Sequence, residues 1–133
     1  MRNILKKIID KKKEKNKIYK NKYPENKLLK DIKNIKNFIN FKDKIKKRDL
    51  EQKISIIAEI KKSSPSAGEI IKKFNPLDIA KVYVENGASF LSVLTEEDFF
   101  LGKLDHIKNI KSNYKIPILC KDFFIDTYQI ALA

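Results

Sequence analysis

Residues 54–61 read Ile-Ser-Ile-Ile-Ala-Glu-Ile-Lys, a short, β-branched run that is almost continuously apolar. Such a run is typical of a strand that is buried on both faces of a sheet. Side chains alternate between the faces of a strand, so Glu59 and Lys61 share one face, which is predicted to point into a crevice or a barrel interior. The opposite face suits packing against helices, because its predicted members are all apolar: Ile54, Ile56, Ala58 and Ile60.

Two more buried strands are predicted downstream, at residues 90–95 and 116–120, and a helical pattern follows each of the first two strands. The first helix begins after Asn75, which can cap it, and ends at Gly87. The second covers residues 104–113. Strand–helix alternation with short connections predicts a parallel sheet built from right-handed βαβ units. The pattern alone does not separate a barrel from an open, doubly wound sheet.

The regions that flank these units are predicted to be helical. Asp126 can cap a third helix, of which only the beginning lies before residue 133. Residues 1–53 contain no convincing strand, and Pro24 interrupts their helical pattern. We therefore divide the chain into a basic, mainly helical N-terminal extension, residues 1–53, and three βα units, residues 54–133.

The net charge of +13 comes entirely from the extension. Residues 1–53 contain 20 Lys and Arg against 7 Asp and Glu, whereas residues 54–133 contain 10 of each kind. Only two of the cations are arginine, the residue better suited to bidentate recognition of phosphate or bases. We therefore expect a solvated lysine face and no nucleic-acid partner. The alternative is a non-catalytic protein that binds polyanions through residues 1–53.

Several classes of protein are excluded or disfavoured by composition. No stretch approaches the roughly 20 apolar residues that a membrane helix needs, and the N-terminus has no signal-peptide core, so no membrane partner is expected. The only cysteine, Cys120, excludes an internal disulfide and is expected to be a small buried residue. A cytoplasmic location is the simplest expectation. The only histidine, His106, is expected on a helix face, and nothing indicates a metal site.

Charged side chains lie where the predicted strands end, at the edge where α/β folds bind ligands. Glu59 and Lys61 would each keep the other charged, and Lys121 would lie at the same rim, where a partly desolvated lysine can act as a general acid. The alternative for Glu59 and Lys61 is a purely structural ion pair, and the alternative for Lys121 is an ordinary exposed lysine. The loop at residues 63–68 is a candidate lid or oxyanion contact.

At these residues the chain resembles the indole-3-glycerol phosphate synthase family. The similar segments occur in order and with family-like spacing: residues 58–68, residues 74–76 with 79, 80 and 83, residues 87–88, 91–96 and 99–102, and residues 117–123 and 128–130. The resemblance implies an α/β fold of the (β/α)₈ TIM-barrel type, incomplete here at about three strands of eight, with an N-terminal helical extension. Another phosphate-binding barrel, such as the isomerase one step earlier, is disfavoured by the Ser-Pro-Ser loop and the Lys-Asp-Phe strand end.

The resemblance also implies an activity and a set of roles. The family closes the ring of 1-(o-carboxyphenylamino)-1-deoxyribulose 5-phosphate with decarboxylation and dehydration, a step of tryptophan biosynthesis that needs no cofactor. Lys121 would be the general acid, Lys61 would bind the anionic groups of this phosphosugar substrate, and Glu59 would orient Lys61 and the substrate. Four further residues would line the substrate site: Ser64, Pro65, Phe100 and Phe123.

The resemblance covers only the first part of a barrel of about 250 residues. The later strands, which supply the family's further catalytic carboxylate and phosphate-binding loops, have no counterpart here. We therefore expect the isolated chain to lack synthase activity. The sequence leaves open whether it is a fragment or a truncated gene product, whether it folds alone, its oligomeric state, the docking of residues 20–50 and whether another tryptophan-pathway enzyme is fused downstream.

Overall fold

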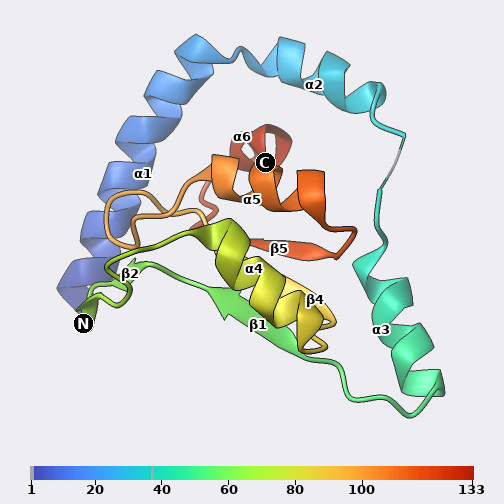
Figure 1. Cartoon of the computed structure of the whole chain (residues 1–133). Helices are drawn as coiled ribbons and strands as arrows, with labels where there is room; N and C mark the ends of the chain where they lie inside the picture. Colours follow the sequence, from blue (N-terminus) through green and yellow to red (C-terminus); the bar gives the residue numbers. More distant parts are fainter. Residues whose placement is uncertain (1, 37) are drawn as a thin grey trace. The chain divides into compact units, whose positions relative to one another are not determined.

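The computed structural model describes residues 2–36 and 38–133, which belong to two compact units (Figure 1). One unit, Ile39–Lys121, holds α3 (Phe41–Leu50), β1 (Ile57–Ile60), β2 (Ser63–Ser64), β3 (Gly68–Glu69), α4 (Pro76–Glu85), β4 (Phe90–Leu94), α5 (Leu104–Asn113) and β5 (Ile118–Lys121). The other unit joins the segment up to Phe38 with Asp122–Ala133, and holds α1 (Arg2–Lys22), α2 (Glu25–Lys33) and α6 (Thr127–Leu132). We call them the sheet unit and the helical unit.

The sheet unit contains the predicted parallel sheet, with three strands in the order β1-β4-β5. The first strand is shorter than predicted, since Ile54 and Ile56 lie ahead of β1 and are 83% and 51% exposed. Their predicted packing against helices is therefore wrong. For Ile54 the reason lies in the preceding helix, because the Arg48 guanidinium donates to the carbonyl of Ile54 (2.6 Å) and holds it beside α3.

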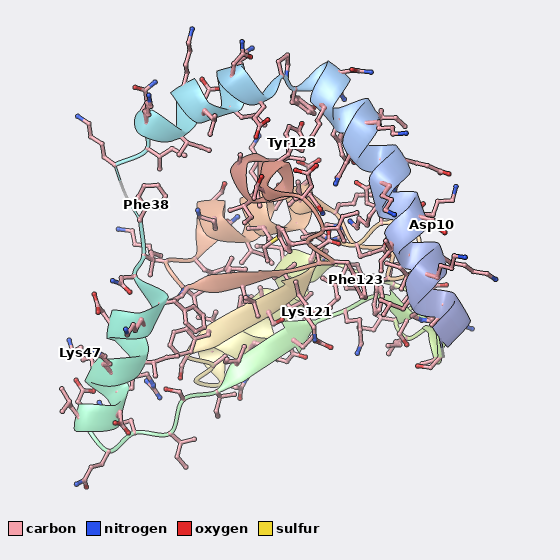
Figure 2. All side chains as sticks on the ribbon, turned by 180° about the vertical axis from the view of Figure 1, so that it is seen from behind. Asp10, Phe38, Lys47, Lys121, Phe123 and Tyr128 are labelled. Carbon is pink, nitrogen blue, oxygen red and sulfur yellow. The ribbon has the colours of Figure 1, made fainter. Side chains whose placement is uncertain are left out.

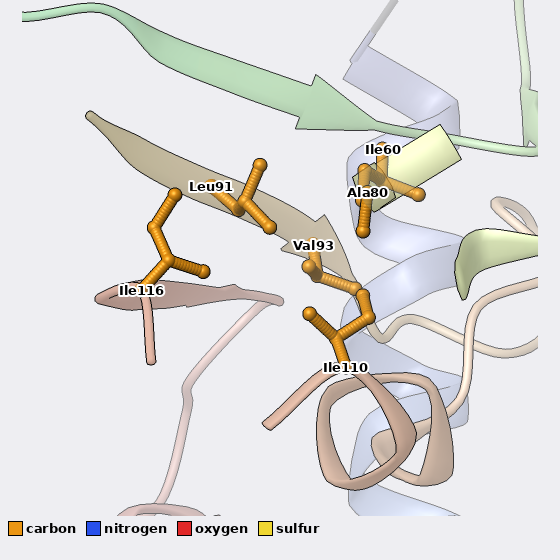
Figure 3. Packing of buried hydrophobic residues seen from close by; sticks show 6 residues of the cluster. All are labelled: Ile60, Ala80, Leu91, Val93, Ile110 and Ile116. Carbon is orange, nitrogen blue, oxygen red and sulfur yellow. The ribbon is translucent and has the colours of Figure 1, made fainter. Parts of the chain in front are cut away.

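The core of the sheet unit forms where α4 and α5 cover one face of the sheet (Figure 1). Ala58 and Ile60 point to this side, as the alternation predicted. Figure 3 shows the buried members of this core packed together: Ile60, Ala80, Leu91, Val93, Ile110 and Ile116. The opposite face of the sheet carries Glu59.

The predicted helix ends are confirmed. The Asn75 side chain accepts a hydrogen bond from Leu77 N–H at the start of α4, and Gly87, just past its end, has a φ of +88°. Asp126 begins α6 with a capping box that includes Gln129. Cys120 was expected to be buried, but it is only half-buried, because β5 is an edge strand of the three-stranded sheet.

Gly102 allows the loop after β4 to return close to that strand. A Cβ atom on this residue would lie 2.2 Å from the carbonyl oxygen of Leu94, which is backbone and cannot move aside easily. We expect Gly102→Ala to lower the free energy of unfolding by about 1–3 kcal/mol through overpacking. Urea unfolding followed by circular dichroism measures this, with the exposed neighbour Lys103→Ala as the control. Equal midpoints for the two variants would contradict the close approach.

In the helical unit, α1 carries a polar stripe that binds the segment around the start of α6. The stripe residues are four apart, so they lie on one face of the helix. Three side-chain pairs form at 2.6, 3.1 and 2.6 Å respectively: Lys12–Asp122, Asn16–Gln129 and Lys20–Asp126. Lys12 and Asn16 are buried, so the expectation that the lysines of the extension form a solvated face is wrong for Lys12.

The hydroxyl of Tyr128, a buried residue of α6, donates to the carbonyl of Tyr23 (2.9 Å) just after α1. Within the described ranges, no helix combines the length and the apolar character required to cross a membrane.

Candidate active site

A carboxylate bound by two lysines lies at the carboxyl ends of the outer strands of the sheet. Lys61 Nζ lies 2.8 Å from Glu59 Oε1, and Lys121 Nζ binds the other oxygen, Oε2. Lys121, labelled in Figure 2, is the last residue of β5, and Glu59 belongs to β1, so the contact spans the central strand. The structure therefore brings together the three residues that the sequence predicted as catalytic. The Lys121–Glu59 contact was not itself predicted.

The electrostatics of this cluster favour an anionic ligand. Burial acts to raise the pKa of Glu59, but the hydrogen bonds from Lys121 and Lys61 outweigh it and hold the pKa below its ordinary value. The carboxylate is thus ionised at neutral pH, and the two ammonium groups leave one positive charge in surplus. The side chains of Glu59, Lys61 and Lys121 are 31%, 32% and 52% exposed, so a ligand from solvent can reach all three.

The strands hold this cluster through their register. Glu59 pairs with Ser92, and Lys121 pairs with Leu94, so these side chains occupy successive levels of one sheet face. The amino end of the same face is closed by α3, where the rings of Phe41 and Phe90 lie 4.3 Å apart. The charged cluster is therefore the polar, open end of a face whose other end is apolar and covered.

A small hairpin directly follows Lys61, where the sequence predicted a loop. In this antiparallel β2–β3 pair, the Ser63 hydroxyl donates to the carbonyl of Gly68 (2.9 Å), and Ala67 N–H donates to the Ser64 hydroxyl (3.1 Å). Ser64 is half-buried and Pro65 is exposed at the turn. Both predicted lining residues thus sit on the connection that leaves β1, while the Ser64 hydroxyl is engaged within the hairpin.

Sequence reasoning missed Glu96, which organises the loop after β4. Its side chain is fully buried, and its carboxylate accepts hydrogen bonds from three successive backbone N–H groups at 2.7–3.1 Å, those of Asp98, Phe99 and Phe100. This arrangement fixes the position of Phe100, a predicted wall residue, which is half-buried. Nothing in the sequence distinguishes Glu96 from the adjacent Glu97.

The remaining predicted residues lie outside this cluster. Phe123 belongs to the helical unit, where its carbonyl accepts a hydrogen bond from Gln129 Nε2 (3.0 Å). His106 is half-buried against Phe74, with ring centroids 5.5 Å apart, and burial is the main cause that lowers its pKa. The described residues contain no group of three or more His, Cys, Asp or Glu arranged to hold a metal ion.

Comparison with known proteins covers almost the whole chain. The sequence model of the family described as indole-3-glycerol phosphate synthase matches residues 5–133. The indole-3-glycerol phosphate synthase of Aliarcobacter butzleri is 45% identical over 130 residues, which are 98% of this chain and 49% of that protein. The corresponding protein of Alkaliphilus metalliredigens is 46% identical over 127 residues, 96% of this chain and 48% of its own.

The chain is also similar to part of a longer protein. The tryptophan biosynthesis protein TrpCF of Buchnera aphidicola is 46% identical over 122 residues, which cover 81% of this chain and 27% of that protein. The chain spans about half the length of the two synthases that it matches.

Proposed function

The chain belongs to the indole-3-glycerol phosphate synthase family, and we propose that it supplies the first part of that enzyme's active site. The observation that carries the proposal is the Glu59 carboxylate with Lys61 on one oxygen and Lys121 on the other. A carboxylate held between two partly exposed lysines, with one positive charge in surplus, suits a substrate that has two anionic ends.

The proposed reaction is ring closure of 1-(o-carboxyphenylamino)-1-deoxyribulose 5-phosphate with loss of carbon dioxide and water. Lys121 donates the proton that promotes attack on the ketone carbon, since it is an exposed ammonium at the strand end. Lys61 binds an anionic group of the substrate, and Glu59 orients both lysines. Four residues line the site and exclude water from the anthranilate ring: Ser64, Pro65, Phe100 and Phe123.

We further propose that β1, β4 and β5 are the first three strands of a (β/α)₈ barrel. In the sequence they are preceded by an extension formed by residues 1–53. The parallel pairing and the helices on one face support this arrangement, because a barrel places its helices outside and its ligand site at the carboxyl ends of the strands. We also propose a cytoplasmic location for this step of tryptophan biosynthesis.

The test compares the chain with a joined protein, defined as residues 1–133 followed by the remaining residues of the Aliarcobacter butzleri relative. We expect the chain alone to show no turnover and the joined protein to form a fluorescent indole product. The chain contributes two lysines and a carboxylate, and the second half contributes the rest of the site.

The control for this test is the unmodified relative, assayed under the same conditions. Turnover by the 133 residues alone would contradict the expectation for the isolated chain. A folded joined protein without turnover would contradict the proposed function of the cluster.

A further inference from the structure

Ser92 in the central strand carries a hydroxyl that the structure leaves without a partner. The residue is 5% exposed, and among the described residues its buried Oγ has no hydrogen-bond partner. Burying an unpaired hydroxyl is unfavourable, so such groups in folded proteins call for an explanation. Ser89, three residues earlier, is equally buried, but its hydroxyl accepts a hydrogen bond from Ile56 N–H (3.3 Å).

Among the described strand residues beside Ser92, one carries an acceptor side chain. In the sheet register its neighbours are Glu59 on β1 and Leu119 on β5, and the adjacent residues on its own face of β4 are Phe90 and Leu94. Three of these four side chains are apolar. The lysines one level higher carry donors and no acceptor. Within the described sheet, the carboxylate beside Ser92 on this face is therefore that of Glu59.

The hydroxyl cannot act on a ligand directly from its present position. Its oxygen is buried, whereas Glu59 beside it is partly exposed and contacts both lysines. An ionised carboxylate can accept about four hydrogen bonds, so Glu59 has sites left beyond the two that the lysines occupy. When an anionic substrate attracts Lys61 and Lys121, Glu59 loses donors and a nearby hydroxyl can replace one of them.

We propose that Ser92 is a positioning residue, whose hydroxyl donates to the Glu59 carboxylate when the lysines turn toward the bound substrate. The inference rests on the proposed function of the cluster. It assigns Ser92 no contact with the substrate. It accounts for an unpaired hydroxyl in the middle of an otherwise apolar strand, because Glu59 accepts from it only after the lysines have turned toward the substrate.

The test uses Ser92→Ala in the joined protein. We expect kcat to fall about 10- to 100-fold, as for loss of a hydrogen bond to a charged group, with KM changed less than about threefold. The midpoint temperature of unfolding should stay the same or rise, because the variant removes a buried group that is unpaired in the free protein. Ser92→Thr keeps the hydroxyl and should retain most of the kcat.

Ser89→Ala is the matched control, because this buried serine has its partner within the structure. It should lower the midpoint temperature and leave kcat unchanged, the opposite pattern to Ser92→Ala. A Ser92→Ala protein that is less stable, or that keeps its full kcat, would overturn the inference while the proposed function stands. An unmodified joined protein that folds without turnover would instead remove the proposed function and this inference with it.

Discussion

Lys121→Ala should reduce turnover of the joined protein by about 100- to 10,000-fold, the usual contribution of a positioned general acid. Folding should be unaffected, because the side chain is 52% exposed and Glu59 keeps its ion pair with Lys61. Steady-state fluorescence assays and thermal unfolding measure the two effects. Lys111→Ala, an exposed lysine in the last turn of α5, is the control and should retain full activity.

Lys121→Arg separates the proton donor from the ion pair. Arginine keeps the positive charge and can still bind Glu59, but it does not release a proton near neutral pH. We expect this variant to remain as inactive as Lys121→Ala. Substantial activity in Lys121→Arg would mean that Lys121 serves as a structural partner of Glu59, the simpler of the two roles that its position allows.

The βα units were predictable because their patterns are local. A continuous apolar run predicts a buried strand, and Asn75 and Gly87 carry end signals that depend only on neighbouring residues. The start of β1 was less predictable. Ile54 is as apolar as the residues of the strand, but a contact from Arg48 in the preceding helix decides its place. The type of residue at position 54 does not predict that contact.

The site was predictable where position along a strand decides it. Alternation placed Glu59 on the open face, and strand ends placed Lys61 and Lys121 at one rim. Ser92 and Glu96 were missed because their significance depends on which partners surround them. A serine within an apolar strand and a glutamate within an acidic loop have no distinctive local pattern.

Lys12→Met should lower the free energy of unfolding of the joined protein by about 3–5 kcal/mol, the usual effect of removing one partner of a buried ion pair. The side chains of Lys12 and Asp122 are 9% and 10% exposed and lie 2.6 Å apart, so the variant removes a buried cation from a carboxylate in a nearly dry position. Urea unfolding followed by circular dichroism gives the change, provided that the slope against urea concentration is unaltered.

The matched control is Lys11→Met, one residue earlier on α1. Its ion pair with Glu14 has side chains that are 53% and 64% exposed, so we expect a loss below about 1 kcal/mol. Both variants remove one positive charge from the same helix, so a general effect of net charge would change them equally. A large difference would therefore show that the basic extension contains a structural contact with Asp122, the residue that follows Lys121. Equal, small losses of unfolding free energy in the two variants would instead mean that Lys12 is solvated, as the composition predicts for the lysines of the extension.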